Sequence, residues 1–314
     1  MYRIGIDLGG INIACGLVDN DGNLVCKRSV PTFAEGNDGA AVAAGMVNAA
    51  LNIIGENGLE ESDISVIGIG IPGAVDRDRG FVIRTANVPL DGFDLAAFFA
   101  ERTSVPIRLD NDANCAALGE AVAGAAKGVK NCITVTLGTG VGGGIIIDGK
   151  IYSGFNFAGG EMGHMVTHLG GRLCGCGRRG CFETYASATA IINDTREAMR
   201  QHPESKISEL VGGDPDKVNG KTVFDAAEMG DETAKQVVEN YIVELGDGIV
   251  NYVNIFQPEV ILLGGGIANQ GEKLLVPLRQ YVGTYSYGAG LIPATKILKA
   301  ALGNDAGIIG AAML

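Results

Sequence analysis

The sequence predicts an α/β protein made of two related halves that face each other across a cleft. Segments with the composition of buried strands alternate with segments whose apolar residues recur at helical spacing, and this alternation implies helices layered on sheets. Both halves begin with a strand, a glycine turn and a second strand, and both later present a strand, glycines and a helix. With 314 residues, the chain is long enough for two domains with a substantial core.

The first half opens as a β-meander. We expect a strand at residues 2–8 that ends at a pair of glycines. Two more strands are expected at 13–19 and 24–30, joined at 20–23 by a hairpin turn of Asp-Gly type. The rest of this half is expected to contain a helix at 38–55, a buried strand at 64–71, a helix at 94–103, a strand at 105–109 and a helix that runs to Ala125.

The second half repeats this order. A strand at 132–137 leads into a glycine-rich loop over 138–144, and residues 145–152 are expected to form a hairpin turned at Asp148-Gly149. The remaining elements are expected to be helices at 185–201, 222–230 and 231–255, a strand at 259–263, and helices at 270–282 and 305–314. We place the domain boundary near residue 111, so that the small domain comprises 1–110 with the C-terminal helix at 300–314 and the large domain comprises 111–299 with a metal-binding loop at 161–183.

The composition excludes several classes of protein. A hydrophobic content of 46% excludes wholesale disorder, and 49 glycines without a regular repeat exclude collagen. The net charge of −12 argues against nucleic acid as a partner, because affinity for a phosphate backbone comes from lysine and arginine.

We expect a protein of the reducing cytosol that is neither exported nor inserted into a membrane. The first residues, Met1 to Asp7, carry an aspartate where a signal peptide needs an apolar core. No apolar run approaches the roughly 18 residues of a membrane helix. In the cytosol, cysteine clusters more often bind metal than form disulfides.

The most specific motif places one histidine and three cysteines in a short loop. It has the pattern His-x9-Cys-x-Cys-x4-Cys and consists of His164, Cys174, Cys176 and Cys181. This is a complete ligand set for a closed, tetrahedral zinc site. The alternatives are buried free cysteines, against which the polar, Gly- and Arg-rich loop argues, and disulfides, against which the odd total of seven cysteines argues. Glu161 and Glu183 flank the motif, so a metal here would fix two carboxylates as a polyol site requires.

Two glycine turns join one strand to the next. Gly9 and Gly10 let backbone N–H groups approach a phosphate, and Asp7 just before them is placed to hold Mg²⁺, directly or through water. Taken alone, this pair of glycines is equally well explained as a simple hairpin turn. The loop that begins with Gly138 is the stronger signal, because Thr139 adds a hydroxyl beside consecutive amides. Since a strand follows, it is neither a P-loop nor a Rossmann turn.

A third glycine turn, Gly264 to Gly266, is expected to precede a helix, whose N-terminus can receive a nucleotide phosphate. An ordinary strand-to-helix turn explains it nearly as well.

The polar triplet Asp110-Asn111-Asp112 ends one strand and begins a helix. That edge is the usual ligand side of an α/β sheet. One of the three must cap the helix, but three polar residues exceed what a cap requires. Phosphoryl transfer needs a general base near the attacking hydroxyl of the substrate. A carboxylate opposite a phosphate-binding loop can serve as this base.

Together these motifs resemble the ROK family (repressors, open reading frames, sugar kinases), and within it the bacterial glucokinases. The resemblance covers the chain end to end, and the histidine–cysteine motif is specific to the family whereas the glycine loops are not. The motifs that carry it are Asp7-Leu8-Gly9-Gly10-x-Asn12, Asn111-Asp112-Ala113-Asn114, Gly138 to Gly144, Gly160-Glu161-Met162-Gly163-His164, Cys174 to Glu183, and Gly264 to Gly266.

This resemblance implies the two-domain, actin-like ATPase fold shared by sugar kinases, Hsp70 and actin, closing over sugar and ATP. It implies Asp112 as the base for the sugar hydroxyl, Mg²⁺ that arrives with ATP, and structural Zn²⁺. The implied sugar-binding residues are Gly73, Ala74, Asn87, Asn111, Asp112, Glu161, His164 and Glu183. The implied nucleotide-binding residues are Asp7, Gly9, Gly10, Ile11, Asn12, Gly138, Thr139, Gly140, Gly265 and Gly266.

One position departs from the family. Where the family usually has a threonine after the glycine pair, this chain has Ile11. The threonine hydroxyl would face the ATP phosphates, so its loss is expected to weaken ATP binding while the backbone amides remain.

The sequence thus predicts a cytoplasmic ATP-dependent hexose kinase, specifically a glucokinase that makes glucose 6-phosphate for glycolysis and forms a homodimer. A kinase for N-acetylmannosamine or another hexose is the alternative within the same family. A different class is the sugar-sensing repressor, but the first strand starts at residue 2 and leaves no room for a DNA-binding domain before it. A sugar-binding protein without catalysis is the third alternative, and the retained Asp112 argues against it.

Overall fold

The structure is a computed structural model that describes residues 1–314. Internal contacts divide the chain into two compact units. The first unit comprises residues 1–134, 144–160 and 301–314, and the second comprises residues 135–143 and 161–300. The domain boundaries inferred from the sequence stay a prediction.

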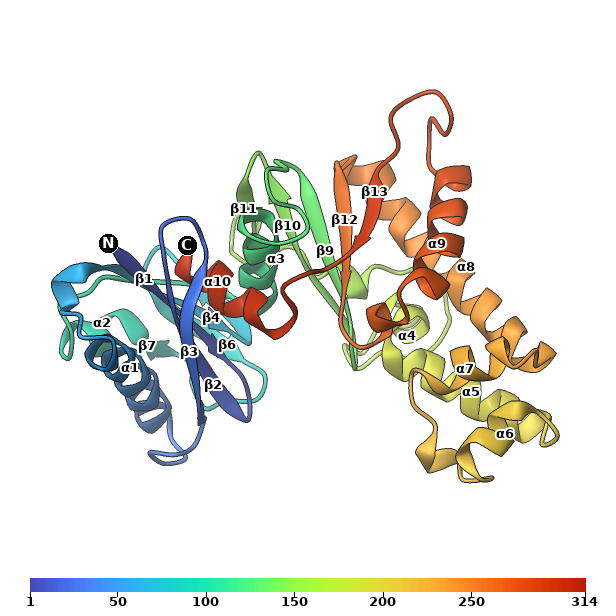
Figure 1. The fold of residues 1–314 in the computed structure, drawn as a ribbon, viewed down its shortest axis with the longest axis horizontal. Helices are drawn as coiled ribbons and strands as arrows, with labels where there is room; N and C mark the ends of the chain where they lie inside the picture. Colours follow the sequence, from blue (N-terminus) through green and yellow to red (C-terminus); the bar gives the residue numbers. More distant parts are fainter. The chain divides into compact units, whose positions relative to one another are not determined.

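A five-stranded sheet forms the centre of the first unit (Figure 1). The β-meander and two later strands predicted from the sequence are confirmed, with shifts of one or two residues at their ends. The strand order is β3–β2–β1–β4–β8, where β1 is Tyr2–Leu8, β2 is Asn12–Val18, β3 is Leu24–Pro31, β4 is Ile64–Ile71 and β8 is Ile107–Asn111. Strands β1, β4 and β8 run parallel, so their carboxyl ends share one edge of the sheet.

Helices cover both faces of this sheet (Figure 1). Alternate residues of β1, such as Ile4 and Ile6, are buried in the core that α1 (Gly39–Glu56) completes. On the other face α10 (Ala306–Ala312) lies against the strands, beside α3 (Asp112–Val122). A Cβ at Gly5 would lie 1.8 Å from the carbonyl oxygen of Ile308, so α10 can approach only because this position is glycine.

Helix α1 is the one helix whose length and composition would allow it to cross a membrane, although half of that stretch is buried within the protein. A buried core helix meets the same criterion, so this is weak grounds for a membrane span. The polar residues Asn48, Asn52 and Glu56 interrupt its apolar sequence.

A small sheet between β4 and β8 was not foreseen. Residues 73–94 form a small antiparallel sheet, and the helix predicted at 94–103 shortens to α2 (Leu95–Ala100). The strands of this sheet are β5 (Gly73–Asp76), β6 (Phe81–Thr85) and β7 (Phe93–Asp94).

A second five-stranded sheet has the order β11–β10–β9–β12–β13. Its strands are β9 (Cys132–Leu137), β10 (Val141–Ile147), β11 (Lys150–Tyr152), β12 (Val260–Gly264) and β13 (Lys296–Lys299). The glycine-rich loop predicted over 138–144 is shorter than expected, because β10 already begins at Val141. The hairpin turn at Asp148-Gly149 is confirmed, and both residues have positive φ.

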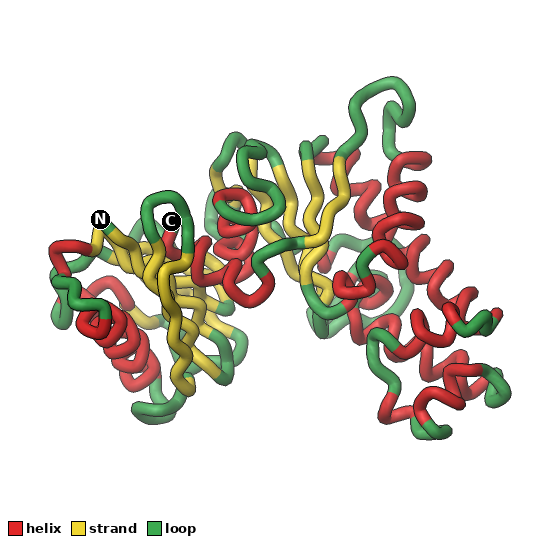
Figure 2. The backbone as a smooth tube through the Cα atoms, viewed as in Figure 1, coloured by secondary structure: helices red, strands yellow, loops and turns green.

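The rest of the second unit is mainly helical (Figure 2). The helix predicted at 185–201 is interrupted at Ser187, whose hydroxyl accepts from Ala190 N and caps a new helix. The turn Gly264 to Gly266 leads into a 3₁₀ turn, Ile267–Gln270, rather than directly into an α-helix, which corrects the predicted helix start. The α-helices are α4 (Glu183–Ala186), α5 (Ala188–Gln201), α6 (Lys206–Val211), α7 (Thr222–Glu228), α8 (Glu232–Phe256) and α9 (Glu272–Tyr285).

Candidate active site

Two clusters of predicted site residues are present, one in each unit. The first gathers at the carboxyl edge of the first sheet. Strand pairing aligns Asp7 of β1 with Gly70 of β4, and Gly70 with Asp110 of β8. One step further along, Ile71 pairs with Asn111. The parallel register therefore carries the polar residues from distant parts of the sequence to a common edge.

The start of α3 fixes the position of Asp112. The side-chain oxygen of Asn111 accepts from the backbone N–H groups of Ala113 and Asn114, so Asn111 is the N-cap and Asp112 is the first helical residue. The amide nitrogen of Asn111 donates to the carbonyl oxygen of Gly73 at 3.1 Å, which links the cap to the start of β5. The predicted sugar residues Gly73, Asn111 and Asp112 are thus brought together.

Asp110 lies beneath this cap and is 3% exposed. Its Oδ1 accepts from the backbone N–H of Asn111 and from Asn114 Nδ2, both at 2.8 Å, and its Oδ2 accepts from Arg77 at 3.0 Å. A buried carboxylate is tolerated when each oxygen has a donor, as here. Arg77 was not singled out from the sequence, because nothing in its local pattern marks it as the partner of a residue 33 positions away.

The carboxyl of Asp7 has a raised pKa. Burial raises the pKa of Asp7 to about 6, and the negative charge of Asp112 adds to the rise. A Cβ at Gly307 would lie 2.5 Å from Asp7 Oδ2, so the first turn of α10 leaves room for this carboxylate only as glycine. Two carboxylates within electrostatic range of each other are a suitable environment for a cation.

The turn from Gly9 to Asn12 has a built-in support. Gly9 N donates to Asn12 O at 2.9 Å, and the hydroxyl of Thr32 donates to Gly9 O at 2.7 Å. Thr32 N also donates to Ile11 O. Thr32 is 1% exposed. It was not predicted from the sequence, because a threonine just after a strand has no distinctive pattern.

Two further predicted residues lie at this turn. Ile11 is 80% exposed and packs little of its side chain against the protein. A Cβ at Gly10 would lie 3.3 Å from Cβ of Asn87, so the turn passes close to Asn87, a predicted sugar ligand. Asp7, Gly9, Gly10, Ile11, Asn12, Gly73, Ala74, Asn87, Asn111 and Asp112 therefore all belong to the first unit.

The second cluster surrounds the turn between β9 and β10, which we call the glycine turn (Gly138 to Gly140). The turn is closed by a hydrogen bond from Gly138 N to Gly140 O at 3.0 Å. Gly265 has φ of +84°, and a Cβ there would lie 2.4 Å from the carbonyl oxygen of Leu137, the residue before the turn. The predicted nucleotide residues Gly138, Thr139, Gly140 and Gly265 are thus neighbours within the second unit.

The cysteine motif folds into a compact set of metal-ligand atoms, which we call the cysteine cluster (His164, Cys174, Cys176 and Cys181). Its four ligand atoms all lie within 4.8 Å of one another. His164 Nδ1 is 3.6 Å from Cys174 Sγ, and Cys176 Sγ is 3.7 Å from Cys181 Sγ. A tetrahedron with metal–ligand distances of about 2.0–2.3 Å has edges of roughly 3.3–3.8 Å, so these spacings fit one metal ion.

Two observations qualify the sequence interpretation of this loop. Cys174 and Cys181 are buried and only Cys176 is exposed, so the polar sequence did not predict burial correctly. Burial raises the pKa of Cys174 to about 12, whereas the backbone N–H of Arg178 lowers the pKa of Cys176. A cation that deprotonates coordinating thiols offsets this cost. All seven cysteines are free thiols in the structure.

The flanking glutamates lie on either side of this cluster. Glu161 is exposed and precedes a 3₁₀ turn, Met162–His164, which Tyr252 anchors by donating its hydroxyl to Met162 O at 2.9 Å. Glu183 is the first residue of α4, and its Oε2 accepts from Val141 N at 3.1 Å. Glu161, His164 and Glu183, the remaining predicted sugar ligands, belong to the second unit.

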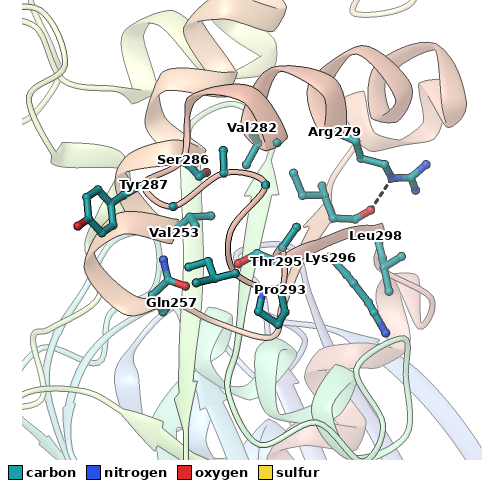
Figure 3. Close-up of a pocket in the computed structure, with 17 residues that line it drawn as sticks. Val253, Gln257, Arg279, Val282, Ser286, Tyr287, Pro293, Thr295, Lys296 and Leu298 are labelled. Carbon is teal, nitrogen blue, oxygen red and sulfur yellow. Dashed lines mark hydrogen bonds between the residues drawn. The ribbon is translucent and has the colours of Figure 1, made fainter.

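A separate cavity of about 320 Å³ is lined by residues at the ends of α8 and α9, by the loop that follows α9, and by β13 (Figure 3). Its lining is mainly apolar and includes Val253, Val282 and Leu298, and Arg279 at its rim donates to Ile297 O at 2.8 Å. None of the predicted site residues lines it, so it is not the candidate active site.

Comparison with known proteins settles the family. The sequence matches the ROK family over residues 3–314. The chain belongs to the ROK family. The predicted family is therefore confirmed, and so is the actin-like α/β fold.

Individual relatives span nearly the whole chain. A glucokinase of Halalkalibacterium halodurans is 38% identical over 317 aligned positions, covering 100% of this chain and 94% of that protein. The crystal structure of a ROK family glucokinase from Streptomyces griseus, in complex with glucose and AMPPNP, superposes with a TM-score of 0.78 at 33% identity and covers 100% of this chain and 98% of that one. A xylose repressor of Bacillus spizizenii is 31% identical and covers 98% of this chain, which in turn spans 75% of the repressor. The family thus includes both kinases and regulators.

Proposed function

We propose that this protein is an ATP-dependent hexose kinase that converts glucose to glucose 6-phosphate. The observation that carries the proposal is the carboxylate pair Asp7 and Asp112, held at the carboxyl edge of the first sheet beside a turn of glycines. Similarity to glucokinases over the full chain, including one solved with glucose and AMPPNP, supports the same conclusion.

Asp112 acts as the general base. It accepts the proton of the sugar 6-hydroxyl as the oxygen attacks the γ-phosphorus of ATP, and the bond to the β–γ bridging oxygen breaks to release ADP. The N-cap hydrogen bonds of Asn111 hold the base at a fixed position, which supplies the orientation that such transfer needs. The proposed sugar ligands are Gly73, Ala74, Asn87, Asn111, Asp112, Glu161, His164 and Glu183.

The nucleotide phosphates bind to backbone amides at two places, the turn from Gly9 to Asn12 and the glycine turn with its neighbour Gly265. Gly9, Gly10, Ile11 and Asn12 supply one set, and Gly138, Thr139, Gly140, Gly265 and Gly266 supply the other. Mg²⁺ neutralises phosphate charge in this chemistry, and Asp7 offers the oxygen ligand that this ion prefers. The raised pKa of Asp7 fits this role, because an unpaired buried carboxylate gains most from a cation.

The cysteine cluster holds zinc with a structural role. Four protein ligands complete a tetrahedral site, so no position remains for a reactive water. His164 binds through Nδ1, which leaves Nε2 for a sugar hydroxyl. The metal fixes the loop that carries Glu161 and Glu183.

A coupled assay of ADP release over a panel of hexoses and N-acetylhexosamines tests this function. We expect turnover with ATP and glucose, and much lower kcat/KM with N-acetylmannosamine. Turnover with N-acetylmannosamine in place of glucose would establish the alternative kinase. Sugar binding by calorimetry with no ADP release would instead favour a sugar-sensing regulator, the second candidate, for which the similarity to the xylose repressor is the supporting observation.

We further propose that the protein acts in the cytoplasm at the first step of glucose use, and that it forms a homodimer, the commonest assembly of soluble proteins. Light scattering coupled to size-exclusion chromatography measures the latter directly. No nucleic-acid partner is proposed, since the net charge is −12.

A further inference from the structure

The glycine turn forms hydrogen bonds with the segment that follows the cysteine cluster in the sequence. Gly138 O accepts from Ala188 N at 2.8 Å, and Thr139 O accepts from the hydroxyl of Thr189 at 2.8 Å. Both donors stand at the start of α5, immediately after α4. The carbonyl groups of the turn are therefore directed toward this segment.

Glu183 makes a third contact, with the residue that follows the turn. Its Oε2 accepts from Val141 N, just after the turn, at 3.1 Å. A Cβ at Gly140 would lie only 2.1 Å from the same oxygen, so the glutamate occupies the space that any other residue at 140 would fill. A side chain at 140 would therefore displace the Glu183 carboxylate from its contact with Val141 N.

The other end of this carboxylate reaches the cysteine cluster. Cys174 Sγ lies 3.5 Å from Glu183 Oε1, and Cys181 of the cluster lies two residues before Glu183 in the sequence. On the other side of Val141, a Cβ at Gly163, next to His164, would lie 2.1 Å from the Val141 carbonyl oxygen. The backbone of Val141 therefore lies between Gly163 and Glu183, at the two ends of the metal-binding loop.

We propose that Glu183 is a positioning residue that couples the cysteine cluster to the glycine turn, so that the bound metal supports nucleotide affinity as well as sugar affinity. This inference rests on the proposed function, in which the glycine turn binds ATP phosphates. It goes beyond the expectation from the sequence, in which the metal fixes two carboxylates for the sugar. The turn and the cluster are far apart along the chain, but they share one carboxylate.

The physical reason is orientation of the amides. A charge-assisted hydrogen bond from Val141 N to Glu183 holds the peptide that follows the turn in one direction. Without this hydrogen bond, the turn samples other orientations. Binding of a phosphate must then order the turn, and the loss of conformational entropy lowers the affinity. A metal would bind Cys174 as a thiolate, so the coupling runs through Cys181, another ligand, which lies two residues before Glu183 and whose carbonyl oxygen accepts from Thr184 in α4. Without the metal, this start of α4 loses its fixed place and releases Glu183 in the same way.

Calorimetric titration with Mg²⁺-AMPPNP in the absence of sugar tests the coupling. We expect Glu183→Ala to bind this nucleotide about 10- to 100-fold more weakly than wild type, which is the worth of one hydrogen bond to a charged group. Glu183→Gln keeps an acceptor for Val141 N but loses the charge, so its affinity should lie between those of wild type and Glu183→Ala. Glu197→Ala is the matched control, since Glu197 bonds only Arg200 and Gln201 on its own helix.

The metal arm uses Cys176→Ala, which removes the exposed ligand of the cluster. Elemental analysis should show loss of metal from this variant but not from Glu183→Ala. Its nucleotide affinity should also fall, and the double variant should bind no more weakly than Glu183→Ala alone, because both changes release the same contact.

Unchanged nucleotide affinity in Glu183→Ala, with a raised KM for sugar, would overturn the inference and leave the glutamate as a sugar ligand only. Equal losses in the Ala and Gln variants would also contradict it, because the glutamine retains the hydrogen bond. These results leave the proposed function intact. A wild-type protein that binds no nucleotide would instead overturn the proposed function, and the inference with it.

Discussion

Asp7 lies close enough to Asp112 for the charge of one carboxylate to affect the other. Burial is the larger cause and the charge of Asp112 the second, and together they raise the pKa of Asp7 to about 6. The two residues are 105 positions apart in number, but Asp7 lies on β1 and Asp112 begins α3 directly after β8, and the carboxyl ends of β1 and β8 share an edge. Two neighbouring carboxylates lower the stability of the fold, so their placement at this edge indicates a functional role.

The first prediction concerns the cost of this arrangement. Because the pKa of Asp7 is raised above 3.8, the folded state binds more protons than the unfolded state between about pH 4 and pH 6, and stability falls as the pH rises through this window. Asp7→Asn cannot ionise, so at pH 8 it should raise the free energy of unfolding of the protein without nucleotide or Mg²⁺ by up to about 3 kcal/mol. Urea denaturation of the two proteins at pH 8 and pH 4 measures this.

Below about pH 4 the difference should vanish, because Asp7 of the wild type is then protonated in both states. Asp21→Asn, in the exposed turn after β2, is the control and should change little at either pH. A variant less stable than wild type at pH 8 would mean that the charge of Asp7 is stabilised in the free protein.

The second prediction concerns Ile11. Its side chain is 80% exposed at the turn that carries the proposed phosphate-binding amides, so Ile11→Thr adds a hydroxyl without disturbing a core. One additional hydrogen bond is worth about 0.5–1.5 kcal/mol, so KM for ATP should fall by about 2- to 10-fold while KM for glucose stays nearly constant. Steady-state kinetics with each substrate varied gives both constants.

Ile147→Thr, the same change at a partly exposed position of β10, should leave KM for ATP unaltered. If Ile11→Thr leaves KM for ATP unchanged or raises it, the side chain at this position does not face the phosphates.

The third prediction concerns metal and sugar. Purified protein should contain about one zinc per chain, and Cys176→Ala should lose it, since a closed site needs all four ligands. The loop that carries Glu161 and Glu183 would then lose its order, and KM for glucose should rise well above the wild-type value. Elemental analysis and kinetics of the same preparations decide the matter.

Cys26→Ala, in β3 of the first unit, is the control for loss of a cysteine as such. Metal-free wild-type protein that retains full affinity for glucose would contradict the structural role of zinc.

Local patterns predicted a large part of this molecule. Residues 2–8 show alternation and an abrupt glycine end, and the strand was found within those bounds. The grouping of the four cysteine-cluster ligands was also predictable, because they are close in sequence and their spacing determines whether they can converge. Asn111 was among the expected caps, and the cap is the one that the structure contains.

What could not be predicted depends on contacts between distant residues. Val141 starts a strand because β10 finds partners in the sheet, whereas its glycine-rich sequence favours a loop. Thr32 supports Gly9 across 23 positions, and Glu183 reaches Val141 across 42. No local pattern encodes such pairs, since a threonine or glutamate at these positions fits a surface equally well.

The most direct test of the account is the rate of glucose 6-phosphate formation by Asp112→Asn. The asparagine keeps the size and the helix position of Asp112 but cannot accept a proton. With saturating ATP and glucose we expect kcat to fall by about 10²–10⁴, with KM for either substrate changed little. Asp148→Asn, in the exposed turn of the β10–β11 hairpin, should retain full activity. A kcat of Asp112→Asn close to wild type would contradict the assignment of the base on which the proposed mechanism depends.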